Sequence, residues 1–152
     1  MTTSLLQRLT LEHGAVAEFL DLLNRETDAM TQGRFIDLPH LAERKSQLAD
    51  RIAILRRHRE NEQMTLGFRA DRSGAEAATT AAGPLEQEAW SNLQACAAQA
   101  HERNHANGVM IHTHLDFTRQ AINFLKSSGR PLYGPDGAHY SGTASGNRLA
   151  MG

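Results

Sequence analysis

The chain has 152 residues, 40% of them hydrophobic, and a formal net charge of −1. This length suits a single domain, and basic residues scattered along a near-neutral chain do not favour a nucleic acid or an anionic membrane as partner. The one cysteine, Cys96, rules out an intrachain disulfide and a cysteine-based zinc site. Because the N-terminus lacks a secretion-signal pattern and no segment approaches the roughly 20 apolar residues of a membrane span, we expect a cytoplasmic protein without membrane insertion.

An antiparallel pair of amphipathic helices is predicted for the first half of the chain, over about residues 3–32 and 38–66. Apolar residues recur at steps of three and four along both segments, while Gly33 ends the first pattern and Asp37 with Pro39 marks the start of the second. If the helices form a hairpin, residues whose numbers have a constant sum face each other. The facing pairs are Met30 with Leu41, Glu26 with Lys45, Leu23 with Leu48, Phe19 with Ile52, Val16 with Leu55, and Glu12 with Arg59.

Two of these facing pairs join an acid of the first helix to a base of the second. Glu12 faces Arg59, and Glu26 faces Lys45. Ion pairs at a partly buried seam add little net stability, but a shifted register would place these charges against leucine. We therefore interpret the four residues as structural pairs that fix the register of the hairpin.

The second half of the chain is predicted to contain a linker, a long third helix and a tail. Residues 67–84, GFRADRSGAEAATTAAGP, are rich in small residues without apolar periodicity, which indicates a linker with at most frayed helix ends. A stripe at helical spacing then runs over about residues 85–127, and Gly129 ends it. The predicted fold class is all-α: an elongated antiparallel hairpin plus a long third helix, which form a coiled-coil-like three-helix bundle domain over residues 1–129. Residues 130–152 are predicted to form a Gly/Ser-rich flexible tail.

The long helix contains HERNH, residues 101–105, which matches the H-E-x-x-H signature of zinc proteases. His101 and His105 lie one helical turn apart and suit zinc, and Glu102 suits a general base. A third ligand is missing, because Ile111 stands where the longer protease motif requires histidine and no glutamate follows Glu102. We therefore expect no catalytic metal and no cofactor, and a solvated polar patch of histidines in which His101 and His105 are only candidate adventitious ligands for zinc or nickel. A zinc-dependent metallopeptidase is the alternative function.

Off its main stripe, the long helix carries four large apolar residues, Val109, Leu115, Phe117 and Phe124. Three kinds of contact explain them: a client helix lying in a groove, a dimer partner, or a broader core of the bundle. Gly108 beside them has two explanations, close approach of another backbone or chance, since a mid-helix glycine costs about 1 kcal/mol relative to alanine.

Four motifs occur in order along the chain. They are the glutamate-containing seam of the first helix, the second seam with Lys45 among leucines, NHANGVMI at 104–111, and LYGPDG at 132–137. Together they resemble the FlgN family of flagellar export chaperones, from Leu5 to about Gly137. The resemblance implies a noncatalytic cytoplasmic chaperone that binds and protects hook-associated (hook-filament junction) proteins before type III secretion. It implies two partners, the C-terminal helical segments of hook-associated proteins and the flagellar export apparatus.

The motifs that carry the resemblance, together with the apolar residues off the stripe, indicate where a client binds. The predicted client-binding residues are Asn104, Asn107, Gly108, Ile111, Leu115, Phe117, Leu132, Tyr133, Gly134, Asp136 and Gly137. The tail residues among them are expected to fold onto the client or to gate its groove. The sequence leaves a monomer and a homodimer equally open.

Overall fold

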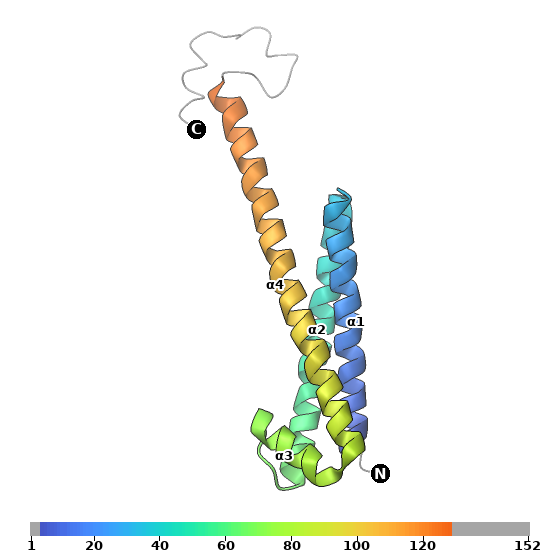
Figure 1. Ribbon diagram of the computed structural model, residues 1–152. Helices are drawn as coiled ribbons and strands as arrows, with labels where there is room; N and C mark the ends of the chain where they lie inside the picture. Colours follow the sequence, from blue (N-terminus) through green and yellow to red (C-terminus); the bar gives the residue numbers. More distant parts are fainter. Residues whose placement is uncertain (1–3, 129–152) are drawn as a thin grey trace. The chain divides into compact units, whose positions relative to one another are not determined.

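The computed structural model describes residues 4–128, and over this range the regular elements are all helices (Figure 1). Helix α1 spans Leu5–Thr31, the short 3-10 helix η1 spans Phe35–Asp37, α2 spans Leu38–Thr65, α3 spans Arg72–Ala82, and α4 spans Pro84–Ser127. The predicted all-α class is confirmed, while the predicted tail, residues 130–152, lies outside the described residues. The chain divides into two compact units, Met1–Asn107 and Gly108–Gly152, which we call unit 1 and unit 2.

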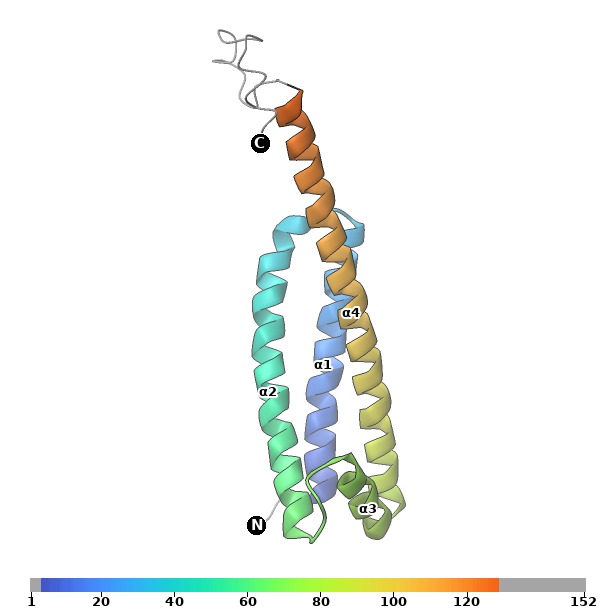
Figure 2. The same cartoon turned by 90° about the vertical axis from the view of Figure 1, so that its left-hand side faces the viewer.

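Helices α1 and α2 form the antiparallel hairpin of unit 1 and lie side by side (Figure 1, Figure 2). Helix α1 begins with a capping box: the Ser4 side chain accepts the backbone N–H of Gln7 at 3.1 Å, and the Gln7 side chain accepts that of Ser4 at 2.9 Å. Between the helices, Gly33 has a φ of +74°, a left-handed conformation that suits glycine. These local signals fix where the hairpin starts and where it turns.

Both ion pairs of the predicted register are present across the hairpin. The Arg59 Nε lies 2.5 Å from a Glu12 carboxylate oxygen, and the Lys45 Nζ lies 3.2 Å from a Glu26 carboxylate oxygen. Both carboxylates are buried and have lost their hydration. The positive charges of Arg59 and Lys45 compensate for this loss. Such pairs add little net stability compared with apolar residues, but removing one partner costs about 3–5 kcal/mol.

The linker predicted over residues 67–84 is wrong, because this segment contains α3. Asp71 caps the helix, since its carboxylate accepts the backbone N–H of Gly74 at 2.7 Å. The helix buries a face of small side chains, Ala75, Ala78 and Thr79. Residues of this size differ little in hydrophobicity from their neighbours, so the helical period could not be recognised in the sequence.

The turn before α3 is held by contacts to its backbone. Gln63, fully buried on α2, donates its side-chain N–H to the carbonyl oxygens of Arg69 and Asp71 at 2.7 and 3.4 Å. A Cβ atom added at Gly74 would lie 1.9 Å from the Arg69 carbonyl oxygen, so only glycine fits there. Gly83, with a φ of +133°, then leads from α3 into α4. The close contact at Gly74 and the positive φ of Gly83 thus determine where α3 ends and α4 begins.

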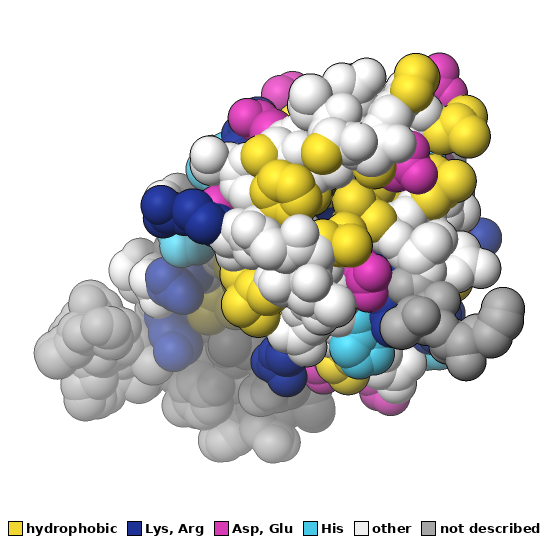
Figure 3. Space-filling view, turned by 90° about the horizontal axis from the view of Figure 1, so that it is seen from below, with side chains coloured by type: hydrophobic (Ala, Val, Ile, Leu, Met, Phe, Trp, Pro, Cys, Tyr) yellow, Lys and Arg dark blue, Asp and Glu magenta, His cyan; other side chains and the backbone are white. Residues whose placement is uncertain are grey.

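The core of unit 1 forms where α3 and the first half of α4 meet α1. Its buried members are Leu5, Leu9, Val16 and Leu23 from α1, Ala78 from α3, and Leu93 and Ala100 from α4. The Arg59 guanidinium lies 5.0 Å from the Trp90 ring centre, a cation–π contact that joins α4 to a buried ion pair. Cys96 packs against the core, and burial raises the pKa of its thiol. Seen from the end that carries α3, hydrophobic side chains gather in the middle of the surface (Figure 3).

Candidate protein-binding site

The second half of α4, in unit 2, exposes many large apolar side chains. Their exposed fractions are 52% for Val109, 36% for Met110, 53% for Leu115, 69% for Phe117, 42% for Ile122, 70% for Phe124 and 37% for Leu125. Ile111 among them is half-buried. Single exposed apolar residues are common on proteins, but a contiguous set of this size is typical of an interaction surface.

Helical spacing arranges most of these residues in two adjacent lines along α4, at about 3.6 residues per turn. One line contains Ile111, Leu115, Ile122 and Leu125. The other contains Met110, Phe117 and Phe124, each seven residues from the next. We call these seven residues the apolar face of α4; Val109 lies off both lines. A line of apolar residues with this repeat can pack against one partner helix. Two adjacent lines therefore form a broader contact surface for a helical partner.

The opposite side of the same segment is polar. Asp116 lies 3.4 Å from an Arg119 nitrogen and 3.7 Å from the His112 ring nitrogen Nε2. Gln120 and Asn123 are exposed on this side as well. The segment is therefore amphipathic, with one side suited to water and the other suited to a protein partner.

Asn107, the last residue of unit 1, lies in the interface between α4 and α1. Its side-chain N–H groups donate to the Leu23 carbonyl oxygen and to a Glu26 carboxylate oxygen, both at 2.9 Å. Its side-chain oxygen accepts the Thr27 hydroxyl at 2.8 Å. Only 1% of the residue is exposed, so Asn107 acts on the helix interface and not on an open surface.

Asn104 extends this network to α2. Its side-chain oxygen accepts an N–H from Lys45 at 3.2 Å, and Lys45 also pairs with Glu26. Polar side chains from three helices thus meet in one hydrogen-bonded network near the end of unit 1. Such a network specifies how the helices pack, because a shifted arrangement would leave buried polar groups without partners.

The other predicted client-binding residues fall in open space or outside the described chain. A Cβ atom added at Gly108 would meet no atom within 4 Å. Close approach of another backbone, one of the two explanations for this glycine, is therefore absent among residues 4–128. The tail residues Leu132, Tyr133, Gly134, Asp136 and Gly137 lie outside the described residues.

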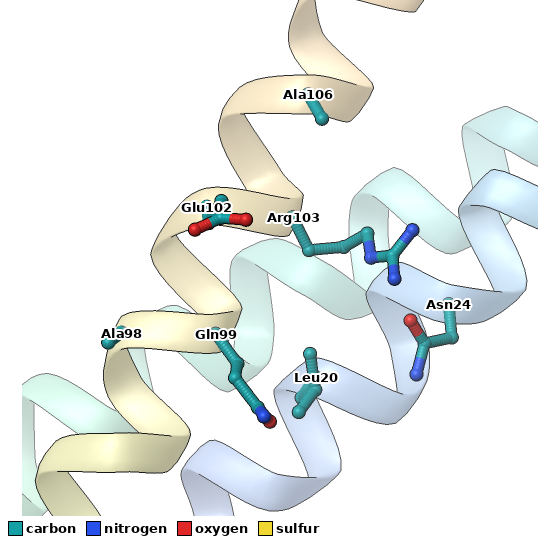
Figure 4. A pocket seen from close by; sticks show the side chains of 7 residues that line it. All are labelled: Leu20, Asn24, Ala98, Gln99, Glu102, Arg103 and Ala106. Atoms are coloured by element: carbon teal, nitrogen blue, oxygen red, sulfur yellow. The ribbon is translucent and has the colours of Figure 1, made fainter.

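Unit 1 also contains a polar groove between α1 and α4, with a volume of about 530 Å³. Its lining residues are Leu20 and Asn24 from α1 with Ala98, Gln99, Glu102, Arg103 and Ala106 from α4 (Figure 4). The Arg103 and Asn24 side chains extend toward the same space from the two helices (Figure 4). The lining offers no nucleophile beside a general base, so this groove does not have the chemistry of an active site.

The H-E-x-x-H residues lie on the surface of α4. His101, Glu102 and His105 are all exposed. Within residues 4–128, no group of three or more His, Cys, Asp or Glu side chains is placed to hold a metal ion. Two histidines fall short of the three protein ligands found in catalytic zinc sites.

A helical bundle followed by an amphipathic helix segment with an exposed apolar face is typical of helical protein-binding modules. The family model described as FlgN protein matches residues 1–141, so the chain belongs to the FlgN family, whose members are non-enzymatic flagellar export chaperones. A relative from Yersinia enterocolitica named flagella synthesis protein FlgN is 25% identical over 152 residues, which cover 95% of this chain and 98% of the relative. No solved structure matches the chain significantly.

The family assignment overturns the metallopeptidase alternative, since FlgN proteins are chaperones and not enzymes. Adventitious metal binding by His101 and His105 stays a prediction. Among the described residues, no helix is long and apolar enough to cross a membrane.

Four residues of the apolar face were not among the predicted client-binding residues: Met110, Ile122, Phe124 and Leu125. The sequence does contain the signal that finds them. Met110 lies seven residues before Phe117, and Ile122 continues the line of Leu115 at the same seven-residue step. Extending the seven-residue repeat past the NHANGVMI motif would therefore have added these residues to the predicted surface.

Proposed function

We propose that this chain is a cytoplasmic chaperone that binds hook-associated (hook-filament junction) proteins of the bacterial flagellum and protects them before type III secretion. The observation that carries the proposal is the exposed apolar face of α4, which suits a helical partner. Membership in the FlgN family supports the flagellar setting. The name of the relative, a flagella synthesis protein, agrees with that setting.

The client docks as an amphipathic helix, which we take to be the C-terminal helical segment of a hook-associated protein. Its apolar side lies along both lines of the apolar face, with Leu115 and Phe117 near the centre of the contact. Burying one large apolar side chain contributes about 1.5–3 kcal/mol, so several such residues can offset the free energy lost on association. The client's own apolar side is covered in the same complex, which keeps it from self-association.

The remaining predicted residues have distinct roles in this proposal. Ile111 contacts the client directly, whereas Asn104 and Asn107 act through the packing of α4 on unit 1. Gly108 leaves space beside the helix backbone that a client can approach. The tail residues at 132–137 add contacts to the client or to the export apparatus by ordering on binding.

The test is a double variant, Phe117→Ser with Phe124→Ser, compared with Gln120→Ser with Asn123→Ser on the polar side of the same segment. Isothermal titration against purified hook-associated proteins from the same cell measures the affinity. We expect the phenylalanine variant to lose at least about tenfold in affinity, because central aromatic residues dominate interface energies. The polar-side variant should bind like the wild type. Far-UV circular dichroism of both variants checks that α4 stays helical.

A second copy of the chain is the competing occupant of the apolar face. Sedimentation of the free protein distinguishes the two, since self-association through this face would produce a dimer that the phenylalanine variant dissociates. If that happens while client affinity is unchanged, the client proposal is wrong. Equal client affinity in the two double variants would also contradict it.

A further inference from the structure

The sequence contains Asn-Gly once, at Asn107 and Gly108, which are the last residue of unit 1 and the first of unit 2. Every other asparagine precedes a residue with a side chain. The backbone nitrogen after an asparagine can attack the side-chain carbonyl carbon and displace ammonia. Glycine at the next position leaves that nitrogen unhindered, because it has no Cβ. Asn107 is therefore the asparagine of this chain at which deamidation is fastest once the chain is unfolded.

In the folded chain, hydrogen bonds occupy both groups that must react. The Asn107 amide donates to the Leu23 carbonyl oxygen and to a Glu26 carboxylate oxygen, both at 2.9 Å. Its oxygen accepts the Thr27 hydroxyl at 2.8 Å, and we call these three bonds the Asn107 network. The Gly108 nitrogen belongs to α4, and helical N–H groups bond to the carbonyl four residues earlier. Ring closure requires both arrangements to open first, so the fold protects the site.

The product of deamidation does not fit this network. An acid at position 107 has lost both N–H donors, and its carboxylate faces the Leu23 carbonyl oxygen and the buried Glu26 carboxylate. Lys45, which lies 3.2 Å from Glu26, then has two carboxylates to balance instead of one. Isoaspartate, the second product, also adds one carbon atom to the main chain and interrupts the helical hydrogen bonds of α4. Both products therefore weaken the interface of α4 with α1.

We propose that Asn107 is a site of spontaneous deamidation, which proceeds when the Asn107 network opens and irreversibly weakens the packing of α4 on α1. In the opened chain, the Gly108 nitrogen gives its proton to solvent base and attacks the Asn107 Cγ. The bond from Cγ to Nδ2 breaks, ammonia leaves with a proton from solvent, and a succinimide forms. Water then adds to one of the two ring carbonyls, which yields aspartate or isoaspartate without any oxidant or reductant. The proposal goes beyond client binding, since water is the only co-reactant.

Peptide mapping by mass spectrometry of the full chain, kept at mildly alkaline pH, measures the conversion of Asn107 to an acid. We expect folded protein to convert at least about tenfold more slowly than protein unfolded in guanidinium chloride, because only the opened fraction reacts. Gly108→Ala should suppress conversion in both states, since its methyl group hinders the attack, and the added Cβ meets no atom within 4 Å in the fold. Equal rates in the folded and unfolded wild type, no conversion of the folded protein on prolonged incubation, or an undiminished rate in Gly108→Ala would each overturn the proposal.

Two threonines of α1 test whether the Asn107 network gates the reaction. Thr27→Val removes the hydroxyl that donates to Asn107, and we expect it to raise the rate in folded protein about two- to tenfold, as the loss of one hydrogen bond predicts. Thr10→Val is the matched control, because both hydroxyls donate to the carbonyl four residues earlier, at 3.0 Å for Thr27 and 2.8 Å for Thr10. Of the two, Thr27 also donates to Asn107. Equal rates in the two variants would show that the network does not gate the reaction.

A variant that copies the aspartate product tests its effect on packing. Asn107→Asp should unfold at a lower urea concentration than Asn107→Ala, because it places a carboxylate beside Glu26. Adding Glu26→Gln to Asn107→Asp should recover part of that loss, since Lys45 then faces one carboxylate again. If Asn107→Asp unfolds at the same urea concentration as the wild type, deamidation leaves the packing intact and the proposal is wrong. None of these measurements uses a client, so this proposal and that of client binding fail separately.

Discussion

The two halves of α4 follow the same helical repeat but carry side chains of different size. In unit 1 the buried residues of α4 are Leu93, Ala100 and Asn107, with Cys96 and Ala97 packed beside the core. In unit 2 the same repeat carries Ile111, Leu115, Ile122 and Leu125, and the last three are 37–53% exposed. Small side chains of α4 belong to the core that it shares with α1, whereas large ones gain free energy only when a partner covers them. One half of the helix thus serves internal packing, and the other carries the exposed surface that we propose as the binding site.

Helix lengths agree with this division of labour. Helices α1 and α2 have 27 and 28 residues, whereas α4 has 44. The change from small to large side chains falls where the two units divide, between Asn107 and Gly108.

The largest expected effect comes from breaking a buried ion pair in unit 1. Glu12→Leu leaves the buried Arg59 without its carboxylate, and we expect the free energy of unfolding to fall by about 3–5 kcal/mol. Urea denaturation followed by circular dichroism measures this change. The double variant Glu12→Leu with Arg59→Met should recover most of the loss, to within about 1–2 kcal/mol of the wild type. If the double variant is as unstable as the single one, packing and not the unpaired charge explains the loss.

The sequence predicted the hairpin well because its signals are strong and local. Leucine seams interrupted by one acid or one base at matching steps leave only one favourable register, and the pairs of Glu12 and Glu26 lie in that register. Helix α3 was not predicted, because its buried face consists of alanine and threonine. The sequence also gives no sign of the division of α4, since the stripe continues without a break through Asn107 and Gly108.

The candidate site was predictable only in part for a related reason. A stripe of apolar residues reveals which side of a helix is apolar, but not whether another part of the chain covers it. Leu115 and Phe117 were identified as apolar residues off the main stripe, whereas the burial of Asn107 depends on contacts with Leu23 and Glu26 from a distant part of the sequence. Long-range partners of this kind leave no mark on the local pattern.

Two leucines, one in each half of α4, offer a direct comparison. Leu93→Ala empties space in the core of unit 1 and should lower the free energy of unfolding by about 2–5 kcal/mol. Leu115→Ala removes a half-exposed side chain and should change it by at most about 0.5 kcal/mol. Thermal and urea denaturation of the free protein measure both values. Similar losses for the two variants would remove the distinction between a packed half and a binding half.

Two asparagines test the same contrast with polar groups. Asn107→Ala removes the hydrogen bonds to the Leu23 carbonyl, the Glu26 carboxylate and the Thr27 hydroxyl in a buried interface, so we expect a loss of about 1–3 kcal/mol. Asn123→Ala, an exposed change in the second half of α4, should be neutral or slightly stabilising, because alanine is the better helix former. Urea denaturation measures the difference. A neutral Asn107→Ala would mean that water replaces these hydrogen bonds without loss.

The smallest expected effect concerns the start of α3 and depends on pH. The backbone N–H of Gly74, helped by Arg69, holds the pKa of the Asp71 carboxyl below its ordinary value of 3.8. A lowered pKa means that the ionised form stabilises the folded state, so this contribution is complete above pH 3.8 and is lost as the pH falls through the lower pKa of the folded protein. Acid titration of Asp71→Asn should therefore lack that part of the stability loss, while keeping the contributions of all other carboxyls. Asp116→Asn, in the second half of α4, is the control, and we expect it to leave the acid sensitivity of unit 1 unchanged. If Asp71→Asn and the wild type lose stability in parallel on acidification, the cap at Asp71 does not contribute through its charge.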